Sequence, residues 1–297
     1  MNRIPPAAPS RRTALAAVGA FVATGLAGTL GTAAAQTELT DLARIKASGA
    51  LKVAVYKDNA PFSDGPANAV TGLDVSIAEA LAAKMGLRLA LLPFDAGENM
   101  NDDLRNMVWR GHYLGYGPAD VMMQVPVDRY LMQRNRQVIV LAPYMRQQLV
   151  LAHDTRKIAD VQSADDLKGQ VLAAERGAGA ASALMGYGGG LLRSQVGIHA
   201  TGQDAVKAVI EGKAAAAYVT RAQAESALFA AGIKPGNIRL SPLSLPGVPD
   251  TGWTVGMAIK AEHKELGLAL EGALAQLRSS GELLAIFQKH GLTLTAP

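Results

Sequence analysis

Cysteine is absent from this chain of 297 residues. Its absence excludes disulfide bonds, cysteine-ligated metals, a thiol nucleophile and the lipidated cysteine of a lipoprotein anchor. Without disulfides, the protein must be stabilised by burial of apolar side chains. A chain of this length can bury enough of them in one or two domains.

Clusters of positive charge are also missing. The formal net charge is +4, and Arg3, Arg11 and Arg12 supply three of these charges before Gln36, which leaves +1 for the remainder. A nearly neutral chain without a Lys/Arg cluster has no electrostatic footprint for nucleic acid. We therefore expect no nucleic-acid partner.

Motifs for metal binding, phosphate binding and nucleophilic catalysis are lacking as well. The sequence contains neither a Gly-x-Ser-x-Gly elbow nor a Gly-x-x-x-x-Gly-Lys-Ser/Thr loop. No histidine has a partner three or four residues away, which argues against a metal site; the five are His112, His153, His199, His263 and His290. We expect no metal, no cofactor, no catalytic residues and no enzymatic activity.

Long apolar runs are confined to the first 35 residues. An apolar stretch from Ala14 to Leu30 follows Arg11 and Arg12 and precedes small residues that end at Ala35. This pattern predicts a signal peptide over residues 1–35, and the paired arginines resemble a twin-arginine export signal. A membrane anchor is the alternative, but a run of about 17 residues is short for a span. We expect an exported protein that is not embedded in the membrane.

Strand-like and helix-like patterns alternate through the rest of the chain. In the first half, strands are expected at 51–56, 87–94 and 120–125, and helices at 37–48, 74–85 and 100–110. In the second half, strands are expected at 170–174, 214–219 and 252–259, and helices at 203–211, 221–231, 262–280 and 282–290. Alternation of this kind predicts α/β units with parallel-rich sheets, whose ligand loops follow the carboxyl ends of the strands.

The segment 119–149 divides the chain. Its three apolar runs are interrupted by Pro126 and Pro143, as expected where one lobe passes the chain to another through a prolyl bend. Three prolines within 241–249 indicate the return crossing. Residues 36–145 and 250–297 are therefore predicted to form lobe 1, and residues 146–249 lobe 2. Tyr144, Arg146 and Pro249 are the candidate hinge residues.

Several short motifs occur in a characteristic order. They are Pro61-Phe62-Ser63, Gly72-Leu73-Asp74, Ala119-Asp120-Val121-Met122, Pro143-Tyr144, Asp166-Leu167-Lys168-Gly169 and Gly281-Glu282-Leu283. This order resembles bacterial periplasmic solute-binding proteins of type II, the family 3 or amino-acid-binding kind. The resemblance implies a two-lobe Venus-flytrap fold with two crossover hinge strands and a periplasmic location. It also implies capture of a small ligand by lobe closure, with delivery to an ABC transporter permease.

Two departures from that family concern its amino-acid ligand. Members that bind amino acids carry a Ser/Thr-rich turn ending in an arginine, whereas the turn 124–129 here has no hydroxyl residue. Thr220 stands where such members place an aspartate for the ligand ammonium. The loss of a charge-assisted hydrogen bond forfeits about 1.5–3 kcal/mol. The altered turn resembles the MxaJ/XoxJ-type accessory proteins of quinoprotein (PQQ-dependent) methanol and alcohol dehydrogenases. That likeness implies a dehydrogenase and a cytochrome c as partners.

The candidate ligand-binding residues follow predicted strand ends. They are Tyr56, Asn59, Phe62, Gln124, Asp128, Arg129, Gly179, Ser182 and Thr220. An aromatic ring in the first loop can stack on a ligand, and Arg129 can clamp an anion. Backbone N–H groups of a helix starting near Gly179 can bind an anion. The alternatives are a packed loop aromatic, a solvated charge and a tight glycine turn.

Two further hypotheses concern a partner surface and an enzyme. The loop 111–118 is longer than usual before a strand and carries Tyr113 and Tyr116, the candidate partner-binding residues. Some proteins of the resembled fold are lyases or dehydratases. That alternative requires a carboxylate in the cleft, for which Glu98 and Glu175 are the candidates.

Overall fold

A computed structural model describes residues 39–233 and 236–297, which lie within one compact unit from Leu39 to Pro297. The predicted signal peptide lies outside the described residues. No helix in the part of the chain that the structure describes has the length and apolar character needed to cross a membrane.

The first sheet has the strand order β4-β1-β5-β12-β6. Its strands are β1 (Ala50–Tyr56), β4 (Arg88–Phe94), β5 (Val121–Pro126), β6 (Val138–Gln147) and β12 (Trp253–Lys260). Strand β1 is parallel to β4 and β5, whereas β12 is antiparallel to both β5 and β6. A short hairpin of β2 (Asp58–Asn59) and β3 (Ser63–Asp64) follows β1.

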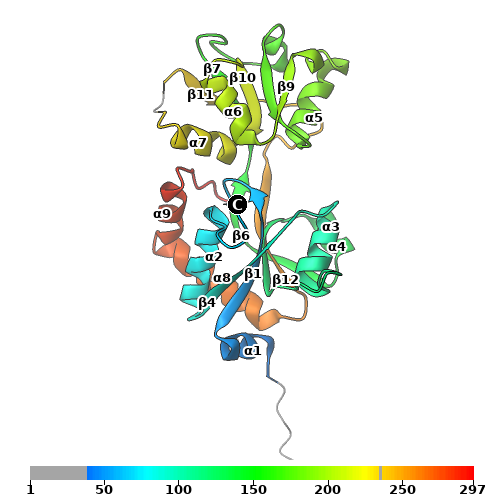
Figure 1. Ribbon diagram of the computed structural model, residues 1–297, viewed down its shortest axis with the longest axis vertical. Coiled ribbons are helices and arrows are strands. Elements are labelled where there is room, and N and C mark those ends of the chain that lie inside the picture. Colours follow the sequence, from blue (N-terminus) through cyan, green and yellow to red (C-terminus); the bar gives the residue numbers. More distant parts are fainter. Residues whose placement is uncertain (1–38, 234–235) are drawn as a thin grey trace, which may run out of the picture. The chain divides into compact units, whose positions relative to one another are not determined.

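Helices pack on both faces of this sheet (Figure 1). They are α1 (Asp41–Ser48), α2 (Leu73–Lys84), α3 (Met100–Leu104), the π-helical turn η1 (Arg105–Trp109), α4 (Arg129–Arg134), α8 (Lys264–Ser279) and α9 (Glu282–Lys289). Leu73, Ile77 and Leu81 of α2 are each at most 1 % exposed and join the core that β1 contributes to. These three apolar side chains therefore mark the buried face of the helix.

The second sheet has the order β11-β7-β10-β8-β9. Its strands are β7 (Leu149–Asp154), β8 (Leu172–Glu175), β9 (Val196–His199), β10 (Ala216–Thr220) and β11 (Ile238–Ser241). Strands β10, β8 and β9 are parallel, and β7 is antiparallel to β10 and β11. The helices around it are η2 (Ala164–Leu167), α5 (Gly179–Gly186), η3 (Tyr187–Gly189), η4 (Arg193–Gln195), α6 (Gly202–Ile210) and α7 (Arg221–Ala230).

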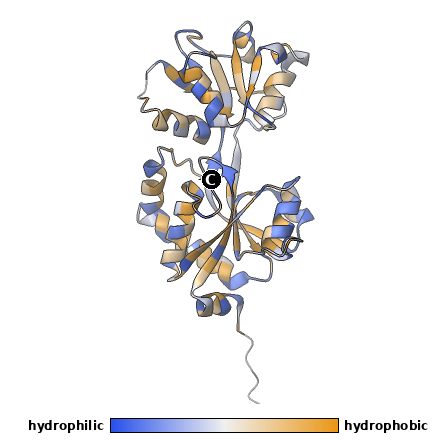
Figure 2. Cartoon of the chain, in the orientation of Figure 1, coloured by the Kyte–Doolittle hydropathy of each residue, from blue (hydrophilic) through white to orange (hydrophobic). Residues whose placement is uncertain are grey.

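Each sheet has an apolar core on both of its faces. Figure 2 shows strands that are largely hydrophobic and helices that carry both hydrophobic and hydrophilic residues. The cores of the second sheet are rich in alanine, with Ala173, Ala216 and Ala217 completely buried. The chain passes from the first sheet to the second between β6 and β7, and it returns between β11 and β12. The predicted fold class, α/β with two parallel-rich sheets flanked by helices, is confirmed.

The predicted prolyl bend at Pro143 is wrong. Strand β6 continues through Pro143 to Gln147. It is an edge strand, so proline's missing N–H deprives no neighbouring strand of a hydrogen bond. The irregularity lies one residue earlier, where Ala142 has φ +48° and the register with β12 shifts. Gly256 faces this bulge, and a Cβ there would lie 2.6 Å from the Leu141 carbonyl oxygen.

Candidate functional site

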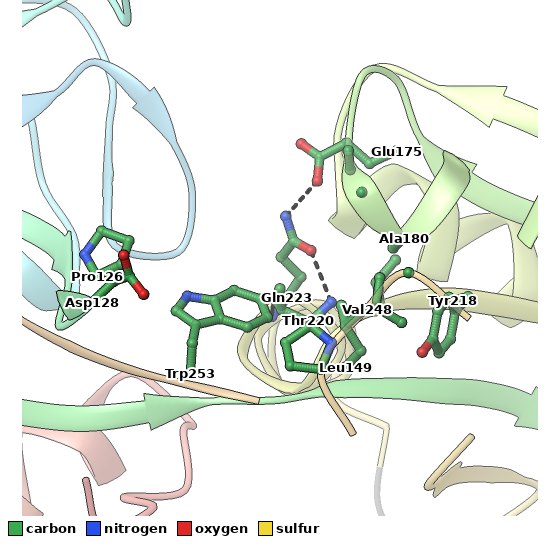
Figure 3. A pocket seen from close by; sticks show the side chains of 15 residues that line it. Pro126, Asp128, Leu149, Glu175, Ala180, Tyr218, Thr220, Gln223, Val248 and Trp253 are labelled. Atoms are coloured by element: carbon green, nitrogen blue, oxygen red, sulfur yellow. Dashed lines mark hydrogen bonds between the residues drawn. The ribbon is translucent and has the colours of Figure 1, made fainter. Parts of the chain in front are cut away.

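A cavity of about 580 Å³ lies where the carboxyl ends of β8 and β10 meet the segments that link the two sheets (Figure 3). Glu175 and Thr220 are the last residues of these two parallel strands, so both reach the same sheet edge. Leu149 begins the antiparallel strand β7 and pairs with Thr220. The lining residues are Pro126, Asp128, Leu149, Glu175, Ala178, Gly179, Ala180, Tyr218, Val219, Thr220, Gln223, Gly247, Val248, Pro249 and Trp253.

Most of the lining is apolar, and its charged groups are of one sign. Asp128 and Glu175 are the acids, and none of the fifteen lining residues is Lys, Arg or His. A volume of this size is within the range of small-molecule sites, about 300–1,000 Å³. The predicted carboxylate clamp Arg129 begins α4 as an exposed residue and is not among the lining residues.

Gln223 links Thr220 to Glu175. Its side-chain Oε1 accepts from the Thr220 backbone N–H at 3.1 Å, and its Nε2 donates to Glu175 Oε2 at 2.7 Å. The Thr220 hydroxyl in turn accepts from the Gln223 backbone N–H at 3.3 Å, which closes a capping box at the start of α7. Because Gln223 is only 9 % exposed, these contacts hold the Glu175 carboxylate at the cavity wall.

Two aromatic rings line the cavity. Trp253 is the half-buried first residue of β12, and its indole lies between Asp128 and Gln223 in Figure 3. Tyr218 is 1 % exposed, and its hydroxyl donates to the Leu243 carbonyl at 2.9 Å. Burial raises the pKa of Tyr218 to about 12. The hydroxyl is thus occupied within the protein, and only the ring serves the cavity.

Asp128 has two roles. Its Oδ1 accepts from the Leu131 backbone N–H at 2.7 Å and caps the N-terminus of α4. The same exposed side chain lines the cavity and adds a negative charge to its wall. Gln124, four residues earlier, is 8 % exposed at φ +61° and does not line the cavity.

The candidate ligand-binding residues of the first loop, Tyr56, Asn59 and Phe62, do not line this cavity. Tyr56 and Asn59 line another hollow of about 450 Å³, beside the ion pair of Lys57 with Asp95 at 2.7 Å. The Tyr56 hydroxyl donates to Asp103 Oδ2 at 2.8 Å, and burial followed by the Asp103 charge raises the pKa of this tyrosine. Phe62 is 2 % exposed within the core of the first sheet, so its ring is used for packing and does not face a cavity.

Of the three candidate ligand-binding residues in the second sheet and its helices, two line the cavity and one does not. Gly179 and Thr220 both line the cavity. Ser182 is exposed on α5, where its hydroxyl donates to the Ala178 carbonyl at 3.4 Å, and it lies outside the lining. Glu98, named for an enzymatic alternative, is exposed and lines neither hollow, whereas Glu175 is central to the cavity.

The candidate hinge residues have three different environments. Tyr144 is fully buried, and its hydroxyl donates to Asp74 Oδ1 at 2.8 Å. Arg146 pairs with Thr254 in the sheet, donates a side-chain N–H to the Thr251 carbonyl at 3.4 Å, and bonds the Thr295 carbonyl through its backbone N–H at 3.0 Å. Pro249 lines the cavity on the return segment.

The candidate partner loop is exposed. Tyr113 is 87 % exposed and Leu114 67 % exposed. The His112 ring stacks on Tyr116 with a centroid distance of 4.3 Å and an interplanar angle of 14°. No group of three or more metal-ligating side chains occurs among residues 39–233 and 236–297.

Comparison with known proteins identifies the architecture. No protein-family model and no curated protein matches the chain. Among solved structures, an ancestral amino-acid-binding protein described as a precursor of cyclohexadienyl dehydratase is 21 % identical, with a TM-score of 0.56 over 84 % of this chain and 99 % of the other. The protein has the two-lobe periplasmic binding-protein fold.

Two further solved structures share this binding-protein fold. One is an amino acid ABC transporter substrate-binding protein from Streptococcus pneumoniae bound to L-arginine, 19 % identical, with a TM-score of 0.57 over 86 % of this chain and 100 % of the other. The second is a polar amino acid uptake binding protein from Streptococcus thermophilus, 17 % identical, with a TM-score of 0.64 over 85 % and 90 % of the chains. At these identities the likeness establishes the fold alone.

Several cavity residues escaped the sequence prediction. Tyr218, Gln223, Val248 and Trp253 were not singled out as ligand residues. Trp253 begins β12 and Gln223 lies just after the end of β10, at the edge where this fold places ligand loops, and that position is the signal that could have found these two. Tyr218 lies in the middle of β10, which the sequence marked only as a buried strand. Val248 lies in the proline-rich return segment, which the sequence marked only as a crossing.

Proposed function

We propose that the protein is a periplasmic binding protein that captures a small ligand in the cavity beside Trp253. The supporting observation is the cavity itself, which is apolar, of ligand size and built from strand ends and linking segments. Lobe 1, residues 36–145 and 250–297, and lobe 2, residues 146–249, would move about the links near Arg146 and Pro249. Closure would remove the ligand from water and strengthen its polar contacts.

Ligand-dependent stabilisation tests this proposal. A panel of amino acids, amines, small carboxylates and PQQ should contain a compound that raises the melting temperature. A ligand present at 100 times its dissociation constant adds about 2.7 kcal/mol to the free energy of unfolding.

A matched pair of variants localises the effect. Val248→Trp fills the cavity and should abolish stabilisation by the ligand, whereas Val171→Trp places the same ring at a position that is 58 % exposed and should preserve it. Equal stabilisation of both variants would show that the ligand binds elsewhere.

Delivery of the ligand to an ABC permease is the role best supported by the binding-protein fold. A second role, as accessory protein of a PQQ-dependent methanol or alcohol dehydrogenase with its cytochrome c, is supported by the exposed Tyr113 and Leu114. Exposed aromatic and aliphatic side chains of this kind are common in docking surfaces. Replacing Tyr113 and Tyr116 by Ser should then weaken binding to the dehydrogenase, and replacing Tyr130, which is 65 % exposed on α4, should not.

A periplasmic lyase or dehydratase is a third candidate because Glu175 lies at the cavity wall as a potential acid or base. Turnover of a candidate substrate that disappears in Glu175→Gln would support it. Binding of an unchanged ligand, with none converted after prolonged incubation, would favour capture alone.

A further inference from the structure

The charges at the cavity wall define the ligand more narrowly than the fold does. Glu175 and Asp128 both line the cavity, and none of its lining residues within 39–233 and 236–297 is a cation. Arg129 and Arg176 follow these two acids in sequence, yet both are exposed and neither lines the cavity. A carboxylate in this space would meet two negative side chains without a cationic partner, and an unpaired buried charge is strongly unfavourable.

Among the residues that the structure describes, the Glu175 carboxylate accepts from one neutral donor, the Gln223 amide. The amide of Gln223 is fixed in one orientation, because its oxygen accepts from the Thr220 N–H while its nitrogen donates to Glu175 at 2.7 Å. Rotation of the amide by 180° would bring its nitrogen against a donor and its oxygen against the carboxylate. No ion pair of Glu175 occurs within the described residues, so its charge is positioned without being neutralised.

The side chain of Gln223 depends on a glycine on the neighbouring helix. A Cβ at Gly202, the first residue of α6, would lie 2.3 Å from the Gln223 amide carbon. Gly202 therefore leaves the room in which the amide reaches Glu175. Gly202 and Thr220 thus position the Gln223 amide, and the Gln223 amide positions the Glu175 carboxylate on the cavity wall.

The remaining wall suits an apolar body that bears a positive charge. Leu149 and Val248 supply aliphatic surface, and Trp253 supplies the ring with the strongest cation–π attraction. One competing feature is the start of α5, whose first residues Gly179 and Ala180 line the cavity and have no side-chain cap. Its partial charge of about +0.5 is smaller than the two full negative charges of the acids.

We infer that the cavity recognises an organic ammonium ion with an apolar body and no carboxylate, held by Glu175, Asp128 and the Trp253 ring. This inference rests on the proposed capture of a small ligand and narrows its chemical class. It separates the ligand from an α-amino acid, since the carboxylate of an amino acid would find no cation among the described lining residues, only neutral donors such as the N-terminal amides of α5, the Thr220 hydroxyl and the Trp253 indole N–H.

Three probes test the inference by isothermal titration calorimetry, and each has a phenyl ring attached to a short carbon chain. They are phenethylamine, L-phenylalanine and 3-phenylpropanoate, which differ in carrying an ammonium, both charges, or a carboxylate. Phenethylamine should bind at least tenfold more tightly than L-phenylalanine, and 3-phenylpropanoate should give no binding. Tighter binding of either carboxylate-bearing probe would overturn the inference while leaving ligand capture intact.

Variants that each remove one carboxylate test which side chains bind the ammonium group. Glu175→Gln should weaken phenethylamine at least tenfold, and Glu211→Gln, which removes a carboxylate paired with Lys213 on the same lobe, should have no effect. Asp128→Ser removes the second charge while keeping a residue suited to cap α4, so it serves if Glu175→Gln does not fold. Unchanged affinity in both Glu175→Gln and Asp128→Ser would overturn the inference.

Gly202→Ala tests the positioning role of Gln223. It should weaken phenethylamine in the native background and have no additional effect in Glu175→Gln, because it acts through that carboxylate. If none of the three probes binds to protein with a normal unfolding transition, the ammonium inference falls. The wider panel of amino acids, carboxylates and PQQ then decides separately whether the cavity binds any ligand.

Discussion

Asp74 is a carboxyl group whose ionisation should set much of the pH dependence of stability. It is 0 % exposed in the first turn of α2, and its Oδ1 accepts from the Tyr144 hydroxyl at 2.8 Å. Burial raises its pKa from 3.8 to about 7, although the hydrogen bond from Tyr144 acts in the opposite direction. The helix N-terminus favours the charged form by about 0.3–1 kcal/mol, too little to offset burial of the whole side chain.

The raised pKa of Asp74 in the folded state determines whether stability rises or falls with pH. Below pH 3.8 the carboxyl is protonated in both the folded and the unfolded protein, so its contribution to stability is complete. As the pH rises from there through about 7, the unfolded chain loses its proton first and stability declines. A difference of about three pH units at 1.36 kcal/mol each gives a loss of about 4 kcal/mol.

Urea unfolding of the native protein and of Asp74→Asn between pH 4 and pH 9 measures this contribution. The neutral amide keeps an acceptor for Tyr144, so we expect the variant to match the native protein near pH 4. It should exceed the native free energy of unfolding at pH 8 by up to about 4 kcal/mol. Asp160→Asn, which alters an exposed carboxylate, is the matched control and should keep the native pH profile. A difference between native and Asp74→Asn that is constant with pH would refute the reasoning.

Two further predictions concern stability at the link between the sheets and at the cavity wall. Gly252 has φ +71°, and a Cβ there would lie 1.8 Å from the Gln147 carbonyl oxygen, so Gly252→Ala should lower the free energy of unfolding by more than the ~1–2 kcal/mol left-handed penalty alone. Gly49→Ala, with φ +68° and open space around the Cβ, isolates that penalty, and equal losses in thermal unfolding would contradict the steric account. Tyr218→Phe should lose about 1–3 kcal/mol because the buried Leu243 carbonyl is left without its donor, and a loss below ~0.5 kcal/mol in urea unfolding would count against it.

The alternation of apolar strands and amphipathic helices made the α/β class predictable. Strands β1, β4, β5, β10 and β12 and most helices lie within a few residues of their predicted positions, because buried strands and amphipathic helices leave clear periodic signals. Strands β9 and β11 were missed, since each is four residues long with little burial or alternation. The bulge at Ala142 is set by contact with β12, which is more than a hundred residues away in sequence.

The cavity was less predictable than the fold. Gly179, Thr220 and Asp128 were proposed because residues that follow strand ends carry the ligand loops of α/β sheets, and all three line the cavity. Phe62 sits in a loop by sequence, yet it belongs to the same apolar core as Leu73 and Tyr144, residues distant from it in sequence. The contact of Gln223 with Glu175 joins residues separated by 48 positions, and no local pattern encodes it. From the sequence, Asp74 was predicted to be an ordinary residue of a helix N-terminal turn. Its contact with Tyr144 joins residues 70 positions apart, which no local pattern shows.

Fluorescence of Trp253 tests most directly the claim that this cavity captures a small ligand. The chain has two tryptophans, so Trp109→Phe leaves Trp253 as the reporter at the cavity wall. We expect a saturable change in emission on titration with phenethylamine. In a separate calorimetric titration, the Val248→Trp variant should give no heat of binding with phenethylamine. A ligand that binds by calorimetry while the emission of Trp253 stays constant through saturation would contradict the account.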